Sequence, residues 1–157
     1  MKCKIPQRQK ILNQKARHVI RQQIGYCSAL VLAETWGWGD KRLNDLKRDV
    51  DAMYTLYDDK YKDSHEYTQM LVGLFTDGSY PVRPGSGEKV LLGREHDIAY
   101  LCHAYQLRKR GFGIGRIQTY HAELQKRIRY YNRTFSDAPG EVLGVMQNRL
   151  ETRGVNL

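Results

Sequence analysis

The chain has 157 residues and a mass of 18.3 kDa, a length that suits one domain over residues 1–157 and excludes two large ones. Its 26 Lys and Arg outnumber its 17 Asp and Glu, which places a polyanion first among the expected partners. No apolar run in the sequence approaches the roughly 20 residues that span a bilayer, and the three cysteines show no CxxC spacing. We therefore expect a cytoplasmic protein with reduced thiols, no membrane partner and no cofactor.

Apolar residues recur at three- and four-residue steps from residue 6 to about residue 36. This spacing predicts a long helix, which Gly25 could interrupt. Four cations lie mainly off its apolar stripe: Lys10, Lys15, Arg17 and Arg21. They form either a solvated outer face or a face that contacts a polyanion.

A second pattern repeats along the chain at a constant offset of 74 residues. The segment Gly37-Trp38-Gly39, with Arg42 and Leu43 behind it, is matched by Gly111-Phe112-Gly113, with Arg116 and Ile117 behind it. The match continues to Tyr57 and Tyr131. We interpret it as an internal repeat of a helix, a Gly-aromatic-Gly turn and a helix, covering about residues 26–61 and 100–135.

The remaining segments complete a mainly α prediction. Asp40 is the expected N-cap of the helix after the first turn, and Asp63 with Glu66 resembles a capping box that opens another helix. A small β-hairpin or loop is expected near residues 78–92, with helix again from Arg94 to Arg110. Ser136 to Pro139 is expected to start a final helix. The predicted fold is a helical bundle of two related helix-turn-helix hairpins plus a C-terminal helix.

The Gly-aromatic-Gly turns resemble the helix-hairpin-helix motif of DNA-binding proteins. The matching residues are Gly37, Gly39 and Leu43 in the first copy, and Gly111, Gly113 and Ile117 in the second. That resemblance implies phosphate binding by turn N–H groups and by the N-terminus of the second helix, without reading of bases. The alternative is a packing role, in which glycine ends one helix and the aromatic ring fills the core beneath the turn.

The second copy is the better candidate for contact, because basic residues surround it. They are Arg108, Lys109, Arg110 and Arg116 at the turn and Lys126, Arg127, Arg129 and Arg133 on the helix. Such a cluster can neutralise several phosphates. The first copy is expected to pack.

The stretch from Trp36 to Leu43 also resembles small uncharacterised bacteriophage proteins that carry Gly-Phe-Gly-x-x-Arg-Leu after an apolar helix. That resemblance implies a mobile-element setting. The expected activity is non-catalytic binding to nucleic acid or to a nucleoprotein complex. The alternative is an anti-CRISPR-like protein that inhibits a host defence nuclease directly. In that setting the location is the host cytoplasm, and the tyrosine-rich helix faces could serve a homodimer.

A third alternative is enzymatic. His65, the adjacent pair His96 and Asp97, and Asp137 follow the order of ligands in the HD-type metal phosphohydrolases. Ligands of this type suit a divalent transition metal that activates water. Alternatively, His96 and Asp97 only open a helix with a favourable N-terminal charge. We expect no enzyme and no metal.

Overall fold

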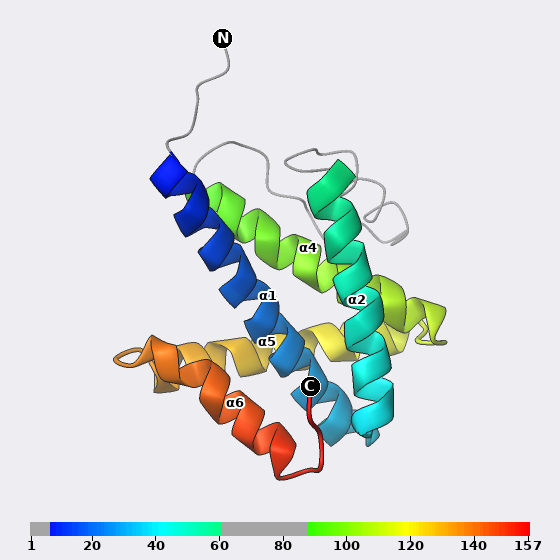
Figure 1. Ribbon diagram of the computed structural model, residues 1–157. Coiled ribbons are helices and arrows are strands. Elements are labelled where there is room, and N and C mark those ends of the chain that lie inside the picture. The colour runs from blue at the N-terminus through cyan, green and yellow to red at the C-terminus, as the bar shows by residue number, and fades with distance from the viewer. Residues whose placement is uncertain (1–6, 61–87) are drawn as a thin grey trace.

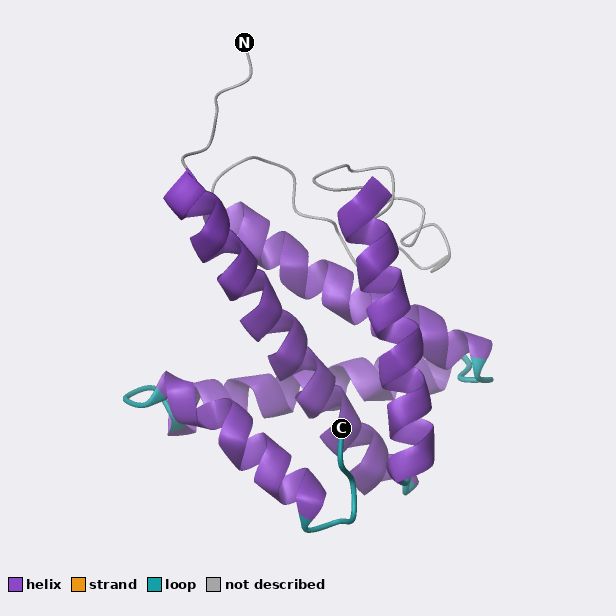
Figure 2. Ribbon diagram, viewed as in Figure 1, coloured by secondary structure: helices purple, strands orange, loops and turns teal. Residues whose placement is uncertain are grey.

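The computed structural model describes residues 7–60 and 88–157, with side chains at 14–59 and 95–157. Five α helices and one short 3-10 helix account for most of this part of the chain, which contains no strand (Figures 1 and 2). The predicted mainly α bundle is confirmed. The elements are α1 (Gln7–Trp36), α2 (Asp40–Lys60), α4 (Glu88–Lys109), α5 (Ile114–Thr134), η1 (Pro139–Glu141) and α6 (Val142–Glu151).

Helix α1 lies at the centre and packs against α4, α5 and α6, whereas α2 packs mainly against α4 (Figure 1). The two helices of each hairpin, α1 with α2 and α4 with α5, make few contacts with each other. Both hairpins are therefore splayed, and they are held together by α1 and α4 packing across one another. Half of the buried hydrophobic core residues lie on α1 and α4.

The apolar stripes expected from periodicity form the core. On α2 the buried positions include Leu43, Leu46, Val50 and Tyr57. The residues 74 positions later, Ile117, Tyr120, Leu124 and Tyr131 on α5, are buried as well. Helix α1 continues through Gly25 without interruption, because the flanking stripe supplies packing that offsets the poor helix propensity of glycine.

The two Gly-aromatic-Gly turns share a backbone feature and touch each other. Gly37 has φ +70° and Gly111 has φ +94°, so each glycine occupies the left-handed region that ends a helix without Cβ strain. The next residue of each turn is buried, and the rings of Trp38 and Phe112 pack edge to face with centroids 5.8 Å apart. Trp36 adds a second ring contact to Phe112 at 5.0 Å. The packing role proposed for these turns is thus present in both.

Two local expectations are wrong. Helix α4 begins at Glu88, so residues 88–92 are helical and not part of a hairpin or loop. The carbonyl of Gly39 accepts the first helical bond of α2, from Leu43 N–H at 3.1 Å, which makes Asp40 the first helical residue instead of the N-cap. The last segment has Pro139 in its first turn, as expected, and that turn is the 3-10 helix η1 with Ala138 as its N-cap.

Some expectations fall outside the described residues. These are the capping box of Asp63 and Glu66, the helix it was expected to open, and residues 78–87 of the expected hairpin or loop. None of the helices in residues 7–60 and 88–157 combines the length and the apolar character of a membrane span.

Candidate nucleic-acid interface

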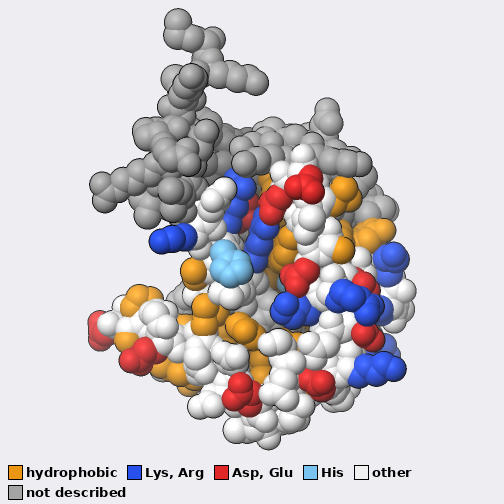
Figure 3. Space-filling view, in the orientation of Figure 1, with side chains coloured by type: hydrophobic (Ala, Val, Ile, Leu, Met, Phe, Trp, Pro, Cys, Tyr) orange, Lys and Arg blue, Asp and Glu red, His pale blue; other side chains and the backbone are white. Residues whose placement is uncertain are grey.

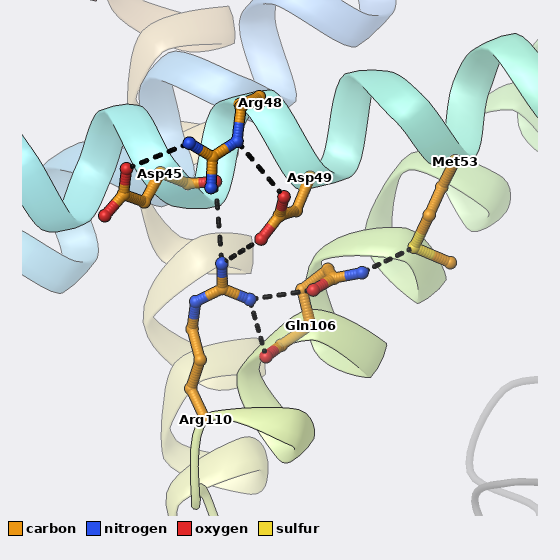
Figure 4. Close-up of polar contacts among 6 residues, drawn as sticks. All are labelled: Asp45, Arg48, Asp49, Met53, Gln106 and Arg110. Carbon is orange, nitrogen blue, oxygen red and sulfur yellow. Dashed lines mark hydrogen bonds and ion pairs between the residues drawn. The ribbon is translucent and has the colours of Figure 1, made fainter.

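Arg110, expected to contact a partner, instead ties α4 to α2 (Figure 4). Its Nη2 donates to Asp49 Oδ2 at 2.5 Å and its Nη1 donates to Gln106 Oε1 at 2.7 Å. The hydrogen bond from Arg110 is the main cause that lowers the pKa of Asp49. Arg48 also reaches Asp49, at 3.4 Å, and Asp45, at 3.4 Å. The charge of Arg110 is therefore largely neutralised within the fold.

Arg17 and Arg21, on the predicted basic face of α1, are also paired. Arg21 makes two parallel bonds to Asp58, at 2.7 and 2.8 Å, and a third to Glu95 at 3.3 Å. Arg17 reaches the other oxygen of Glu95 at 2.9 Å. Burial alone would lower the pKa of Arg21, but its hydrogen bond to Asp58 and the charge of Glu95 outweigh burial and the pKa is raised. This cluster joins α1, α2 and α4.

Glu95 is the buried centre of that cluster. Burial raises its pKa, and the two arginines act in the opposite direction. Arg127 plays a similar joining role elsewhere, since its guanidinium binds Glu34 of α1, which also accepts from Arg149 of α6 at 2.9 Å. Four of the predicted contact residues, Arg17, Arg21, Arg110 and Arg127, thus serve the internal structure.

Two of the cations that remain open, Arg129 and Arg133, lie on one side of α5. Residues at three- and four-residue steps are exposed there and form what we call the α5 face: Gly115, Thr119, Ala122, Lys126, Arg129, Tyr130 and Arg133. The helix carries five basic residues and one acidic residue, Glu123, which pairs with Lys126 at 3.2 Å. Among the described residues, no acidic group lies within ion-pair distance of Arg129 or Arg133. Tyr130 is 56% exposed beside them.

The N-terminus of α5 differs from that of α2. Asp40 lies in the first turn of α2, and its carboxylate accepts from the backbone N–H of Asn156 at 2.7 Å. The first turn of α5 has no acidic residue and Gly113 makes no side-chain cap. Gly113, Ile114, Gly115 and Arg116 are all exposed. An open helix N-terminus of this kind favours an anion.

The other predicted contact residues are spread over the molecule. Arg116 lies over the ring of Phe112 at 5.7 Å, as Arg42 lies over Trp38 at 5.4 Å. Lys109 is exposed beside the ring of Tyr105, Arg108 is half-buried, and Lys15 is exposed on α1. Lys10 lies in α1, where its side chain is not described. Gly111 and Gly113 are both exposed at the second turn.

Three of the four residues considered for a metal site are described by the structure. His96 and Asp97 are half-buried on α4, Asp137 is exposed after α5, and His65 lies outside the described residues. In residues 7–60 and 88–157, no three His, Cys, Asp or Glu side chains come close enough to hold a metal ion.

A cleft of about 360 Å³ between α1 and α2 was not foreseen from the sequence. Its walls include Ala29, Leu43, Leu46 and Val50, and His103 of α4 also lines it. On the face onto which it opens, Lys, Arg, Asp and Glu side chains intermingle over α2, with hydrophobic side chains between them (Figure 3). The cleft exists because the two helices of the first hairpin diverge, a feature that hydrophobic periodicity does not encode.

Comparison with protein-family models, with curated proteins and with solved structures finds no match to this chain.

Proposed function

We propose that the protein binds nucleic acid without catalysis, through the phosphate backbone, using the α5 face and the N-terminus of α5. The observation that carries the proposal is the contrast in charge pairing. Arg17, Arg21, Arg110 and Arg127 are neutralised by internal carboxylates, whereas Arg129 and Arg133 are exposed and have no acidic partner among the described residues.

The spacing of these cations suits a strand of phosphates. Lys126, Arg129 and Arg133 follow one another at three- and four-residue steps, a distance of about 10 Å along the helix axis. One strand of a duplex carries a phosphate about every 3.4 Å of rise, so about three phosphates match this length. Contacts of this kind fix position and give little sequence preference.

The small residues at the other end of the α5 face complement the cations. Gly115, Thr119 and Ala122 leave the helix surface low, so a backbone can approach the open N-terminus of α5 closely. Exposed Tyr130 offers a ring on which an unpaired base can stack. A helix N-terminus together with basic side chains is a recurring site for phosphate.

The first experiment is a gel-shift titration of the protein with a 20-base-pair DNA duplex and with DNA and RNA single strands of the same length. The test variant is Lys126→Gln, Arg129→Gln, Arg133→Gln. Glutamine retains helix propensity, and the change removes the exposed pair of Lys126 with Glu123 but leaves the ion pairs between helices intact. We expect binding to fall by at least about tenfold.

The matched control is Lys41→Gln, Lys47→Gln, Arg48→Gln on α2, which removes the same formal charge from another exposed surface. It should bind nearly as the parent does. Equal losses in the two variants would show that only net charge matters and would contradict the proposal. A parent protein that binds none of the nucleic acids at low salt would also contradict it, and would favour direct binding to a host protein.

A further inference from the structure

The cleft between α1 and α2 contains a buried side chain with one unused hydrogen-bonding position. His103 is 4% exposed, and its Nδ1 lies 2.8 Å from the carbonyl oxygen of Ala99. A carbonyl can only accept, so Nδ1 carries the proton and Nε2 is left as an acceptor in the neutral ring. No residue that the structure describes donates to Nε2. Nε2 is not among the fully buried polar atoms that lack a partner, so it keeps accessible surface and is open to a donor in the cleft.

A glycine in the wall of the cleft points the same way. Gly25 lies in the middle of α1, where glycine is a poor helix former, and it lines the cleft. Its backbone does not need glycine, because its φ lies outside the left-handed region, and a Cβ added there would meet no atom within 4 Å. The same free space is found at the other described glycines. At residue 25, which lines the cleft, the missing side chain leaves the cleft wider.

The charges around the cleft cancel. Arg21 is held by Asp58, and Lys47 is paired with Asp51 at 2.9 Å. Burial lowers the pKa of His103, which keeps that ring neutral. Four apolar residues, Ala29, Leu43, Leu46 and Val50, form much of the wall. The volume of about 360 Å³ falls near the lower end of the range for small-molecule sites, about 300–1,000 Å³.

We propose that the cleft binds a small, uncharged, mostly apolar molecule that donates one N–H or O–H hydrogen bond to His103 Nε2. The occupant lies on the apolar wall, with the space at Gly25 accommodating its body. This site is separate from the α5 face, because its lining comes from α1, α2, α4 and Leu157. Its occupancy and the binding of nucleic acid can therefore be tested independently.

The test uses indole and 1-methylindole, two probes of nearly equal size and hydrophobicity that differ in the N–H donor. Binding to the full-length protein is followed by the ¹⁵N resonance of His103 Nε2 and by backbone amide shifts of α1 and α2. We expect saturable binding of indole with a dissociation constant on the order of millimolar. Binding of 1-methylindole should be weaker by about tenfold, because it leaves the imidazole acceptor unpaired.

Charged probes and two glycine variants complete the design. Benzoate and benzylammonium should bind less well than indole, because the lining offers no net charge. Gly25→Leu should fill the cleft and abolish binding of indole, while Gly144→Leu, at an exposed glycine of α6 with equally free space, should leave it unchanged. Equal affinity for indole and 1-methylindole, or full binding in Gly25→Leu, would overturn the proposal. The absence of any shift with indole would also overturn it.

Discussion

Arg110, the residue that follows α4, donates to Asp49 of α2 across 2.5 Å, and this ion pair connects the two hairpins of the molecule. Because of this bond, Arg110 in the basic cluster around the second Gly-aromatic-Gly turn has a structural role. A substitution of Arg110 would therefore weaken the contact with α2, and a loss of partner binding could not be assigned to a direct contact. Tests of binding therefore belong on the α5 face, where the cations serve no internal contact of this kind.

The Arg110–Asp49 pair should be measurable as a coupling energy. In a double-mutant cycle with Arg110→Met and Asp49→Asn, we expect about 1 kcal/mol of coupling in the free energy of unfolding at pH 7. The pKa of Asp49 is lowered in the folded protein, so this stability is present above the ordinary carboxyl value of 3.8. It is lost as the pH falls through the lowered value. Urea denaturation at several pH values measures this coupling energy. Zero coupling at pH 7 would show that the ion pair does not contribute to stability.

The left-handed glycine of the second turn predicts a backbone penalty. Gly111 has φ +94° and free space at its Cβ position, so Gly111→Ala suffers conformational strain alone. We expect a loss of about 1–2 kcal/mol in the free energy of unfolding. The control is Gly144→Ala in α6, which has ordinary helical geometry and should gain up to about 1 kcal/mol. If both substitutions shifted stability in the same direction, the assigned turn geometry would be wrong.

His103 predicts a dependence of stability on pH. Burial lowers its pKa below the usual 6.5, so the unfolded chain binds the proton more readily than the folded one. The stability is fully present above pH 6.5 and declines as the pH falls below that value toward the lowered folded pKa. His121, whose pKa burial also lowers, adds to the same trend.

His103→Asn isolates the contribution of this histidine, because its amide nitrogen can still donate to the carbonyl of Ala99. Between pH 7.5 and pH 5.5 the parent should lose more stability than the variant, by up to about 1.4 kcal/mol for each pH unit below 6.5. Parallel curves of unfolding free energy against pH for the two proteins would refute the assignment.

The buried thiols predict chemical inertness. Burial raises the pKa of Cys27 and of Cys102 to about 12, and both cysteines are enclosed by the core. In a Cys3→Ser background, we expect labelling by a thiol reagent at pH 8 at least about a hundredfold slower in the native protein than in urea. Rapid labelling under native conditions would show that the core opens readily.

The sequence predicted the helices and the internal repeat from local pattern. Burial of Leu43 and Ile117, and the matched φ values of Gly37 and Gly111, follow from residue spacing and from the chemistry of glycine. The expectation for residues 88–92 is wrong. Gly85 and Gly87, just before them, favour a turn and so placed the expected start of the helix too late in the sequence. Helix α4 nevertheless begins at Glu88.

The site was harder to predict than the fold. A basic residue looks the same in sequence whether or not a carboxylate neutralises it, and the partner of Arg110 lies 61 residues away. Glu34 and Arg127 are separated by 93 residues. The cleft depends on the divergence of α1 and α2, which arises from the packing of both helices against α4. Gly25 was the only local signal for it, and it pointed equally well to a break in the helix.

The most direct measurement of the central claim is the salt dependence of duplex binding. With Arg116, Lys126, Arg129 and Arg133 on phosphates, the logarithm of the binding constant should fall against the logarithm of salt concentration with a slope of about −3 to −4. Lys126→Gln, Arg129→Gln, Arg133→Gln should reduce that slope by about 2 to 3, and the α2 control should keep it. An unchanged slope in the α5 variant would contradict the assignment of nucleic-acid binding to the α5 face.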